Sequence, residues 1–312
     1  MTLEAEIAAA FSRGLGFVLA AQDAEGAWTD WALPPGPSPD WTTAHVGLRL
    51  SGLGLLHRAA LAETLGRATR WLLSRQAAGG GWGYNRAVEP DADSTAQALL
   101  FLAAAGQSAP LEACVFLARH QQPDGGFATF LPDALTGSWG LSHPEITPVA
   151  LLALRAYPGG LSEGSLARGL AWLRRARRPD GLWNSFWWST PLPATEVSLA
   201  FLAALGTPEP LPPALARWHP ADSLEVALLL SITVAAGPSP RLEQLARRLL
   251  ADQLDDGSWK SAPALRITAR DCELPWEAAV SGPLFADPQR LHGTVTALAA
   301  LAKAQQVLAG GV

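Results

Sequence analysis

Several residue types are scarce in this 312-residue chain, and each scarcity excludes a class of protein. The two cysteines, Cys114 and Cys272, form no C-x-x-C pair, which excludes a disulfide scaffold and favours a reducing compartment. Charged residues make up 16% of the chain, and the net charge is −5 with no basic run. We therefore do not expect nucleic acid as a partner.

A signal peptide and a transmembrane segment are also missing from the pattern. Glu4 and Glu6 precede the first apolar run, whereas a signal peptide begins with positive charge. Outside the helices expected below, no segment approaches the roughly 18 uninterrupted apolar residues of a membrane span. These features predict a soluble protein in the cytoplasm.

What the chain has instead is a repeated loop motif, Q-x-x-x-G-x-W. Each copy follows a helical stretch and precedes a second stretch that begins with Asp, Ser, Thr or His and then becomes apolar. Such a repeat, spaced by roughly fifty residues, indicates an array of one supersecondary unit. The copies are QDAEGAW (22–28), QAAGGGW (76–82), QQPDGGF (121–127), RRPDGLW (177–183) and QLDDGSW (253–259).

One unit illustrates the expected structure. Residues 67–75 have helical composition and spacing, and the glycines at 79–81 end that helix. Asp93, Ser94 and Thr95 then offer an N-cap to a stretch that is almost wholly apolar. A helix that is apolar on every side is buried, so each unit should pair an outer amphipathic helix with an inner buried one.

Six such hairpins follow along the chain, and an all-α fold is the result. An inner helix that is apolar all round needs neighbours on every side, so a closed ring is favoured over an open solenoid. The repeat runs from end to end, which predicts one domain over residues 1–312. The fifth unit, near Trp218, lacks the loop motif. The inner helices should begin near Trp41, Asp93, Glu145, Thr195, Asp222 and His292.

The loop motif resembles the QW motif of the terpene cyclase and prenyltransferase superfamily. That superfamily includes squalene-hopene cyclases, oxidosqualene cyclases, the β domains of class II diterpene cyclases and the β subunits of protein prenyltransferases. The resemblance covers the whole chain and implies an (α/α)6 barrel. It says less about the reaction, because these relatives perform different chemistry on one scaffold.

One segment resembles squalene-hopene cyclases in particular. It runs from Gly80 to Ala96 and contains Asp91 and Asp93 followed by Ser-Thr-Ala, where that family carries a DxDD motif followed by Thr-Ala. The middle aspartate of the motif is the family's proton donor. By this resemblance Asp93 is the donor and Asp91 matches the first aspartate, while Ser94 replaces the last one.

The ring itself predicts where chemistry gathers. All inner helices run the same way, so their N-termini meet at one mouth, and each N-terminus carries roughly half a positive charge that favours an anion. The residues at these starts are Asp40, Trp41 and His45; Asp91 and Asp93; His143 and Glu145; Thr195 and Glu196; His219 and Asp222; Arg290 and His292.

Three of these residues are the expected catalytic set. Protonation of an alkene needs a strong acid whose carboxylate is stabilised after proton transfer, and Asp93 at a helix N-terminus fits that need. Asp91 would titrate together with it. His143 is placed to hydrogen-bond Asp93 from the neighbouring unit. The alternatives are that the aspartates cap their helix and that His143 satisfies local backbone groups.

Aromatic residues at the mouth are the expected substrate-binding set, because ring faces stabilise cations. Trp28, Trp82, Trp183 and Trp259 belong to the loop motif, where the Gln and the indole tie neighbouring helix ends together. Core packing remains the alternative for each other aromatic residue. The expected substrate-binding residues are Trp41, His45, Trp139, Phe186, Trp187, Trp188, Trp276 and His292.

A zinc site is the competing hypothesis, since prenyltransferase β subunits use Asp, Cys and His. His292 matches their His position, but Asp222-Ser-Leu224 has Leu in place of the Cys of D-x-C. His219, Asp222 and His292 remain a chemically reasonable ligand set. We expect no metal or other cofactor.

The sequence therefore predicts a class II terpene cyclase-like enzyme that cyclises an isoprenoid or other polyene after protonation by Asp93. A zinc prenyltransferase-like barrel and a non-catalytic isoprenoid-binding barrel are the alternatives. The expected partner is an apolar small molecule, and a second barrel subunit or a membrane surface remain open as further partners.

Overall fold

The repeated units fold into helical hairpins, in a computed structural model that describes residues 2–53, 55–108, 110–133 and 135–310. The outer helices are α1 (Leu3–Ala20), α3 (Leu55–Leu73), α5 (Leu111–Ala118), α7 (Glu163–Arg175), α9 (Pro213–Ala216) and α11 (Pro240–Ala251). The inner helices are α2 (Pro39–Ser51), α4 (Ala92–Ala104), α6 (Ile146–Arg155), α8 (Leu192–Ala204), α10 (Ser223–Thr233) and α12 (Leu291–Leu308). Two short 3-10 helices, η1 (Gly137–Gly140) and η2 (Val234–Ala236), complete the helical elements of the described residues.

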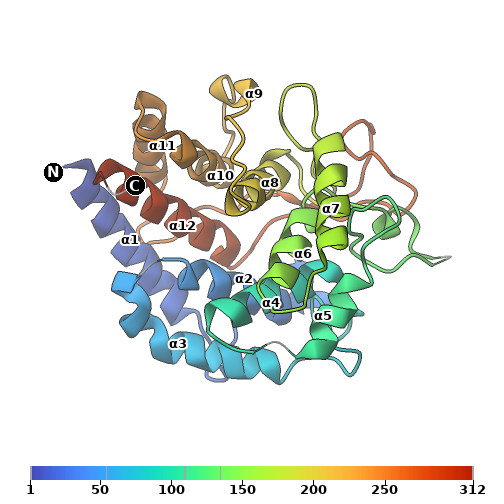
Figure 1. Cartoon of the computed structure of the whole chain (residues 1–312). Coiled ribbons are helices and arrows are strands. Elements are labelled where there is room, and N and C mark those ends of the chain that lie inside the picture. Colours follow the sequence, from blue (N-terminus) through green and yellow to red (C-terminus); the bar gives the residue numbers. More distant parts are fainter. Residues whose placement is uncertain (1, 54, 109, 134, 311–312) are drawn as a thin grey trace.

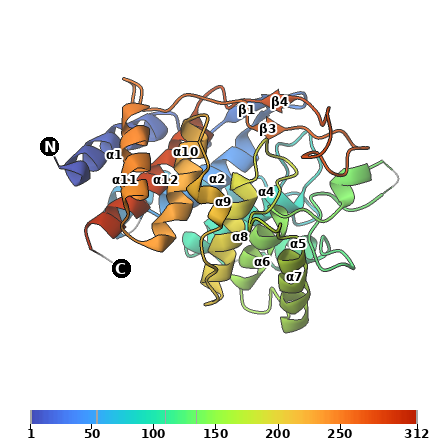
Figure 2. The same ribbon diagram turned by 90° about the horizontal axis from the view of Figure 1, so that it is seen from above.

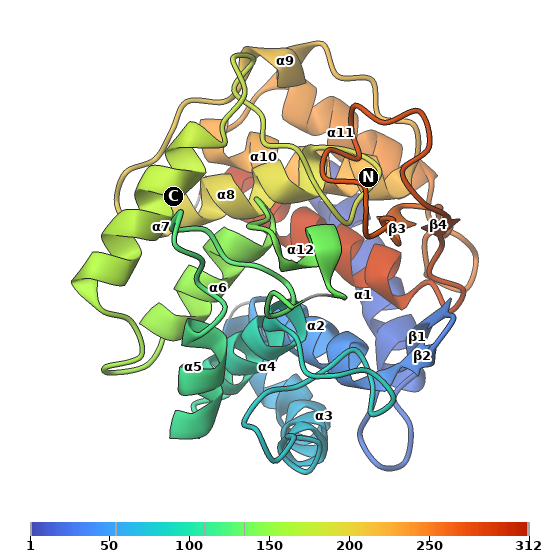
Figure 3. The same cartoon turned by 90° about the vertical axis from the view of Figure 1, so that its right-hand side faces the viewer.

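The inner helices form a closed ring. Along the chain each packs against the next, and α12 packs against α2, which closes the circle. The outer helices surround this ring (Figure 3). The expected all-α (α/α)6 barrel is confirmed, and each inner helix begins within three residues of its expected start.

The loop motif joins neighbouring hairpins as expected. Each motif Trp indole donates to a carbonyl in the last turns of the preceding outer helix at 2.7–2.8 Å. Gln22 and Gln121 donate to carbonyls of the following outer helices α3 and α7. Gln253 donates to the Ala10 carbonyl of α1 at 2.8 Å and so ties the last loop to the first helix.

The motif glycine is required by two features of the same turn. Gly125 has φ +101° and Gly257 has φ +88°, a region that residues with a Cβ rarely adopt. A Cβ on Gly257 would also lie 2.5 Å from the Arg13 carbonyl oxygen of α1. Close packing of loop on outer helix therefore depends on glycine here.

The fifth unit departs from the others in the way its sequence indicates. Its outer helix α9 has four residues and begins at Pro213, directly after Pro212; a helix that started earlier would need backbone N–H groups that these prolines lack. Trp218 replaces the loop motif and donates its indole N–H to the Glu225 carboxylate at 3.2 Å.

Two small antiparallel sheets lie over the N-terminal ends of the inner helices. They pair β1 (Asp30–Leu33) with β2 (Gly36–Ser38) and β3 (Leu265–Arg266) with β4 (Leu284–Phe285), and β1 contacts β4 (Figure 2). The Asp30 carboxylate of β1 accepts the backbone N–H groups of Leu291 and His292 and so caps α12. Chain ends α1 and α12 also pack together (Figure 1). Within the described residues, no helix combines the length and the apolar character that crossing a membrane requires.

Candidate active site

The barrel encloses a cavity of about 330 Å³ between the inner helices and the loops above their N-termini. Helical periodicity sets its wall: Trp41, His45 and Arg49 are spaced four residues apart along one face of α2. Five other inner helices contribute as well. Their lining residues are Asp93, Ser94 and Gln97 of α4; Ile146 and Val149 of α6; Pro193, Glu196 and Val197 of α8; Leu228 of α10; and His292 and Thr296 of α12.

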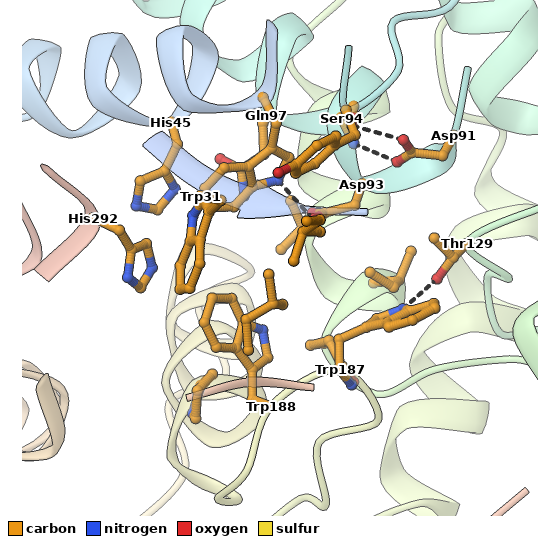
Figure 4. A pocket seen from close by; sticks show the side chains of 18 of the residues that line it. Trp31, His45, Asp91, Asp93, Ser94, Gln97, Thr129, Trp187, Trp188 and His292 are labelled. Carbon is orange, nitrogen blue, oxygen red and sulfur yellow. Dashed lines mark hydrogen bonds between the residues drawn. The ribbon is translucent and has the colours of Figure 1, made fainter. Parts of the chain in front are cut away.

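Asp93 presents its carboxyl group to this cavity from the first turn of α4 (Figure 4). Its Oδ2 accepts a hydrogen bond from the Trp41 indole of α2 at 2.8 Å. Burial raises the pKa of Asp93 to about 6, although hydrogen bonding from Trp41 and Gln97 opposes the rise. Burial therefore favours the protonated carboxyl group, and its carboxylate form already has hydrogen-bond donors in place.

Asp91, two residues before Asp93, has a different structural role. It is the N-cap of α4, and its Oδ1 accepts the Ser94 N–H at 2.7 Å while Oδ2 accepts the Ser94 hydroxyl, also at 2.7 Å. Burial and then the Asp93 charge raise the pKa of Asp91 to about 7. The expected N-cap role of Asp93 is wrong. Asp91 is the N-cap residue of α4, and the Asp93 side chain faces the cavity instead.

His143 does not make the expected hydrogen bond to Asp93. Its Nδ1 lies 2.9 Å from the Thr129 hydroxyl and its Nε2 lies 3.0 Å from the Ser138 carbonyl, so both ring nitrogens are occupied. Burial lowers the pKa of His143 to about 3. Since Thr129 also accepts the Trp187 indole N–H at 2.8 Å, His143 supports a cavity wall and does not contribute to it.

Aromatic rings form most of the wall around Asp93. Trp41 stacks on His45 with ring centroids 4.7 Å apart, and His292 stacks on Trp188 at 5.1 Å. His45 and His292 are 5.0 Å apart, which joins these two pairs into one aromatic surface (Figure 4). Burial lowers the pKa of both histidines, that of His292 to about 3, so this surface is uncharged.

Most of the expected substrate-binding residues line the cavity, and two do not. Trp139 and Trp187 form a second aromatic pair at 5.2 Å. Phe186 lies behind them, stacked on His143 at 3.9 Å, and Trp276 is 38% exposed on a surface loop. The six that line the cavity are Trp41, His45, Trp139, Trp187, Trp188 and His292.

The three residues of the zinc hypothesis are not brought together. His219 is exposed, Asp222 is the N-cap of α10, and His292 lines the cavity. No group of three or more His, Cys, Asp or Glu side chains among the described residues is placed to hold a metal ion.

Several cavity residues were not singled out from the sequence as site residues. Trp31 of β1 adopts φ +45°, a strained value for a residue with a Cβ, and packs on His292 at 5.3 Å. Deeper in the cavity Glu196 pairs with Arg49 at 3.3 Å, and Lys303 lies 3.7 Å from the same carboxylate. Although burial opposes it, these two cations lower the pKa of Glu196 to about 2. The sequence signal that could have identified such cavity residues is polar side chains spaced four residues apart on otherwise apolar helices.

Several solved structures similar to this chain are of one type II terpene cyclase. The type II terpene cyclase MstE from Scytonema, in complex with its substrate geranylgeranyl dihydroxybenzoate, is 26% identical with a TM-score of 0.81 and covers 98% of this chain and 99% of its own. A protein from Actinoplanes is 28% identical with a TM-score of 0.80, covering 96% and 99%. The ent-copalyl diphosphate synthase from Streptomyces platensis, at 21% identity and a TM-score of 0.58, matches over 88% of this chain but 52% of its own, which shows a shared fold.

A scan against protein-family models gives no match, and a search of curated proteins gives none either. The structural likeness nevertheless extends over 98% of this chain and 99–100% of the MstE chains. This chain has the terpene cyclase fold.

Proposed function

We propose that the chain is a type II terpene cyclase, which protonates an isoprenoid alkene with Asp93 and directs its cyclisation inside the barrel. The observation that carries the proposal is the Asp93 carboxyl, held by the Trp41 indole at 2.8 Å in a cavity walled by aromatic rings. A carboxylic acid whose pKa lies near the working pH can carry a proton and still transfer it to an alkene.

The surroundings suit the cation that protonation creates. The faces of Trp31, Trp188 and their neighbours attract positive charge, and the mainly apolar lining offers few polar groups to hold water near the intermediate. After proton transfer, the Asp93 carboxylate is stabilised by the N–H of Trp41. Similarity to MstE supports a prenyl chain as substrate, because that enzyme takes geranylgeranyl dihydroxybenzoate.

Turnover in D₂O tests the proposal directly. The purified protein is incubated with farnesyl, geranylgeranyl and squalene-type substrates and with geranylgeranyl dihydroxybenzoate, and the products are analysed by mass spectrometry. We expect a cyclic product that gains one solvent deuterium, because the Asp93 proton exchanges with solvent before it adds to carbon. If the protein bound these substrates but converted none of them, the result would instead support a non-catalytic barrel.

A further inference from the structure

A third carboxyl group lines the cavity beside the Asp91–Asp93 pair. Glu145 immediately precedes α6, the helix next to α4 in the ring, and is 6% exposed. Its Oε1 accepts the backbone N–H groups of Phe186 and Trp187, both at 2.7 Å. The carboxyl group is therefore fixed in place by one oxygen.

The second oxygen is what sets this carboxyl group apart. Oε2 of Glu145 is buried and has no hydrogen-bond partner among the described residues. Leaving a buried carboxyl oxygen unpaired is unfavourable, and so its retention calls for a reason. Because Glu145 belongs to the cavity wall, a bound substrate is the natural partner.

Two charged groups act on Glu145 from neighbouring elements. Burial raises the pKa of Glu145 to about 7, and the Asp93 charge of α4 adds to the rise. Arg266 of β3 donates to the Phe186 carbonyl at 3.2 Å, and the Glu145 charge opposes the lowering of the Arg266 pKa by burial. Near neutral pH both forms of Glu145 are populated, so the group can accept a proton and release it again.

Cyclisation started by an acid also needs a group that ends it. Protonation leaves a carbocation after ring closure, and an alkene forms only when a neighbouring C–H bond gives up its proton. His45 and His292 also have unpaired ring nitrogens, but burial lowers the pKa of each. They are weaker bases than a carboxylate whose pKa is raised.

We propose, on the basis of the cyclase function above, that Glu145 is the catalytic base that ends the reaction. The C–H bond beside the cationic carbon breaks, its electron pair forms the C=C bond, and the proton passes to Oε2 of Glu145. Asp93 has lost one proton and Glu145 has gained one, so the reaction is an isomerisation with no other reactant. Exchange with solvent then restores both groups.

Glu225 provides a matched control for this residue. It lies near the start of another inner helix, in the first turn of α10, and its Oε2 accepts the Ala221 N–H at 2.9 Å and the Trp218 indole N–H. Unlike Glu145, it does not line the cavity. Glu145→Gln and Glu225→Gln therefore make the same chemical change at similar helix positions, one facing substrate and one not.

The test compares product distributions of the wild type, Glu145→Gln and Glu225→Gln with whichever substrate of the panel the wild type cyclises. We expect Glu145→Gln to consume substrate but to shift the ratio of terminal alkene to water-captured alcohol or to a different alkene isomer by at least about 10-fold. Glu225→Gln should keep the wild-type ratio. An unchanged ratio in Glu145→Gln overturns the role of Glu145 while leaving cyclisation by Asp93 intact.

A binding experiment tests Glu145 without turnover. An N-alkyl decahydroquinoline, protonated at nitrogen, imitates a bicyclic carbocation, and the corresponding N-free decalin is its neutral partner. Titration at pH 8, followed by tryptophan fluorescence, should show wild type and Glu225→Gln preferring the ammonium. Glu145→Gln should lose at least about 10-fold of that preference. Equal preference in all three proteins overturns the inference, even if the wild type cyclises no substrate tested.

Discussion

The pKa of a buried carboxyl group is raised at one end of the cavity and lowered at the other. Near the N-termini of the inner helices, burial raises the pKa of Asp93 to about 6. At the deep end Glu196 is also buried, but Arg49 and Lys303 lower its pKa to about 2. The difference teaches that neighbouring cations, more than depth of burial, decide which carboxyl group keeps a proton. The Asp93 end therefore suits the proposed acid chemistry, whereas Glu196, Arg49 and Lys303 form a charged cluster at the other end, called the ionic floor below.

Removal of the acid should give the largest effect on this contrast. Asp93→Asn keeps the size of the side chain and can still accept the Trp41 N–H, but it has no acidic proton. We expect turnover of the cyclised substrate to fall by at least about 100-fold. Steady-state product formation by mass spectrometry measures it.

Asp222→Asn is the control for that variant, because Asp222 caps α10 outside the cavity and Asn caps a helix nearly as well as Asp. It should retain the wild-type rate. Product formation by Asp93→Asn at the wild-type rate would end the case for Asp93 as the acid.

Breaking the ionic floor should affect stability more than chemistry. In Arg49→Met, Glu196 keeps Lys303 at 3.7 Å and the Ser231 hydroxyl at 2.6 Å but loses its guanidinium. A buried charge that loses a partner destabilises the fold, here by about 2 kcal/mol in urea denaturation at pH 7. Adding Glu196→Gln to Arg49→Met should recover part of this loss. A further loss in the double variant would show that Glu196 does not depend on Arg49.

A cation placed next to Asp93 should lower the pKa of Asp93, as Arg49 and Lys303 do for Glu196. Gln97 lines the cavity and lies close enough to Asp93 to lower its pKa by hydrogen bonding. In Gln97→Lys an ammonium replaces the amide and should lower the Asp93 pKa further, which leaves less of the protonated acid near neutral pH. We expect about 10-fold slower turnover at pH 7 and a pH optimum displaced to lower pH.

Gln97→Met is the size-matched control for this variant, since it fills similar space without charge. A pH profile of Gln97→Lys that coincides with that of Gln97→Met would contradict the electrostatic explanation.

The contrast between the two ends was less visible in the sequence than the barrel was. Periodic apolar stretches and the loop motif predict the hairpins and the inner-helix starts because each unit repeats the same local chemistry. Asp93 was singled out because its segment resembles the DxDD segment of squalene-hopene cyclases and because it lies at a helix start. Glu196 and Arg49 meet across 147 residues, from two helices that only ring closure brings together. His143 was misassigned because its partners, Thr129 and Ser138, lie in the irregular connection between α5 and α6, whose path no periodicity specifies.

Opposite pH dependences of stability give the smallest expected effect and the sharpest form of the comparison. The folded-state pKa of Asp93 is about 6, above the ordinary value near about 3.9, so the folded protein holds more protons than the unfolded chain between these values. Stability contributed by Asp93 therefore falls as pH rises through this window. For Glu196 the folded-state pKa of about 2 lies below the ordinary value near about 4.3, so its contribution is present above about pH 4.3 and is lost as pH falls toward 2.

Relative to wild type, Asp93→Asn should gain about 1–2 kcal/mol in urea denaturation between pH 4 and pH 7.5, whereas Glu196→Gln should be destabilised at pH 7.5 and less so at pH 3. If the difference in unfolding free energy between Asp93→Asn and wild type did not change with pH, the pKa of Asp93 would not be raised in the folded protein. The two ends of the cavity would then differ only in position.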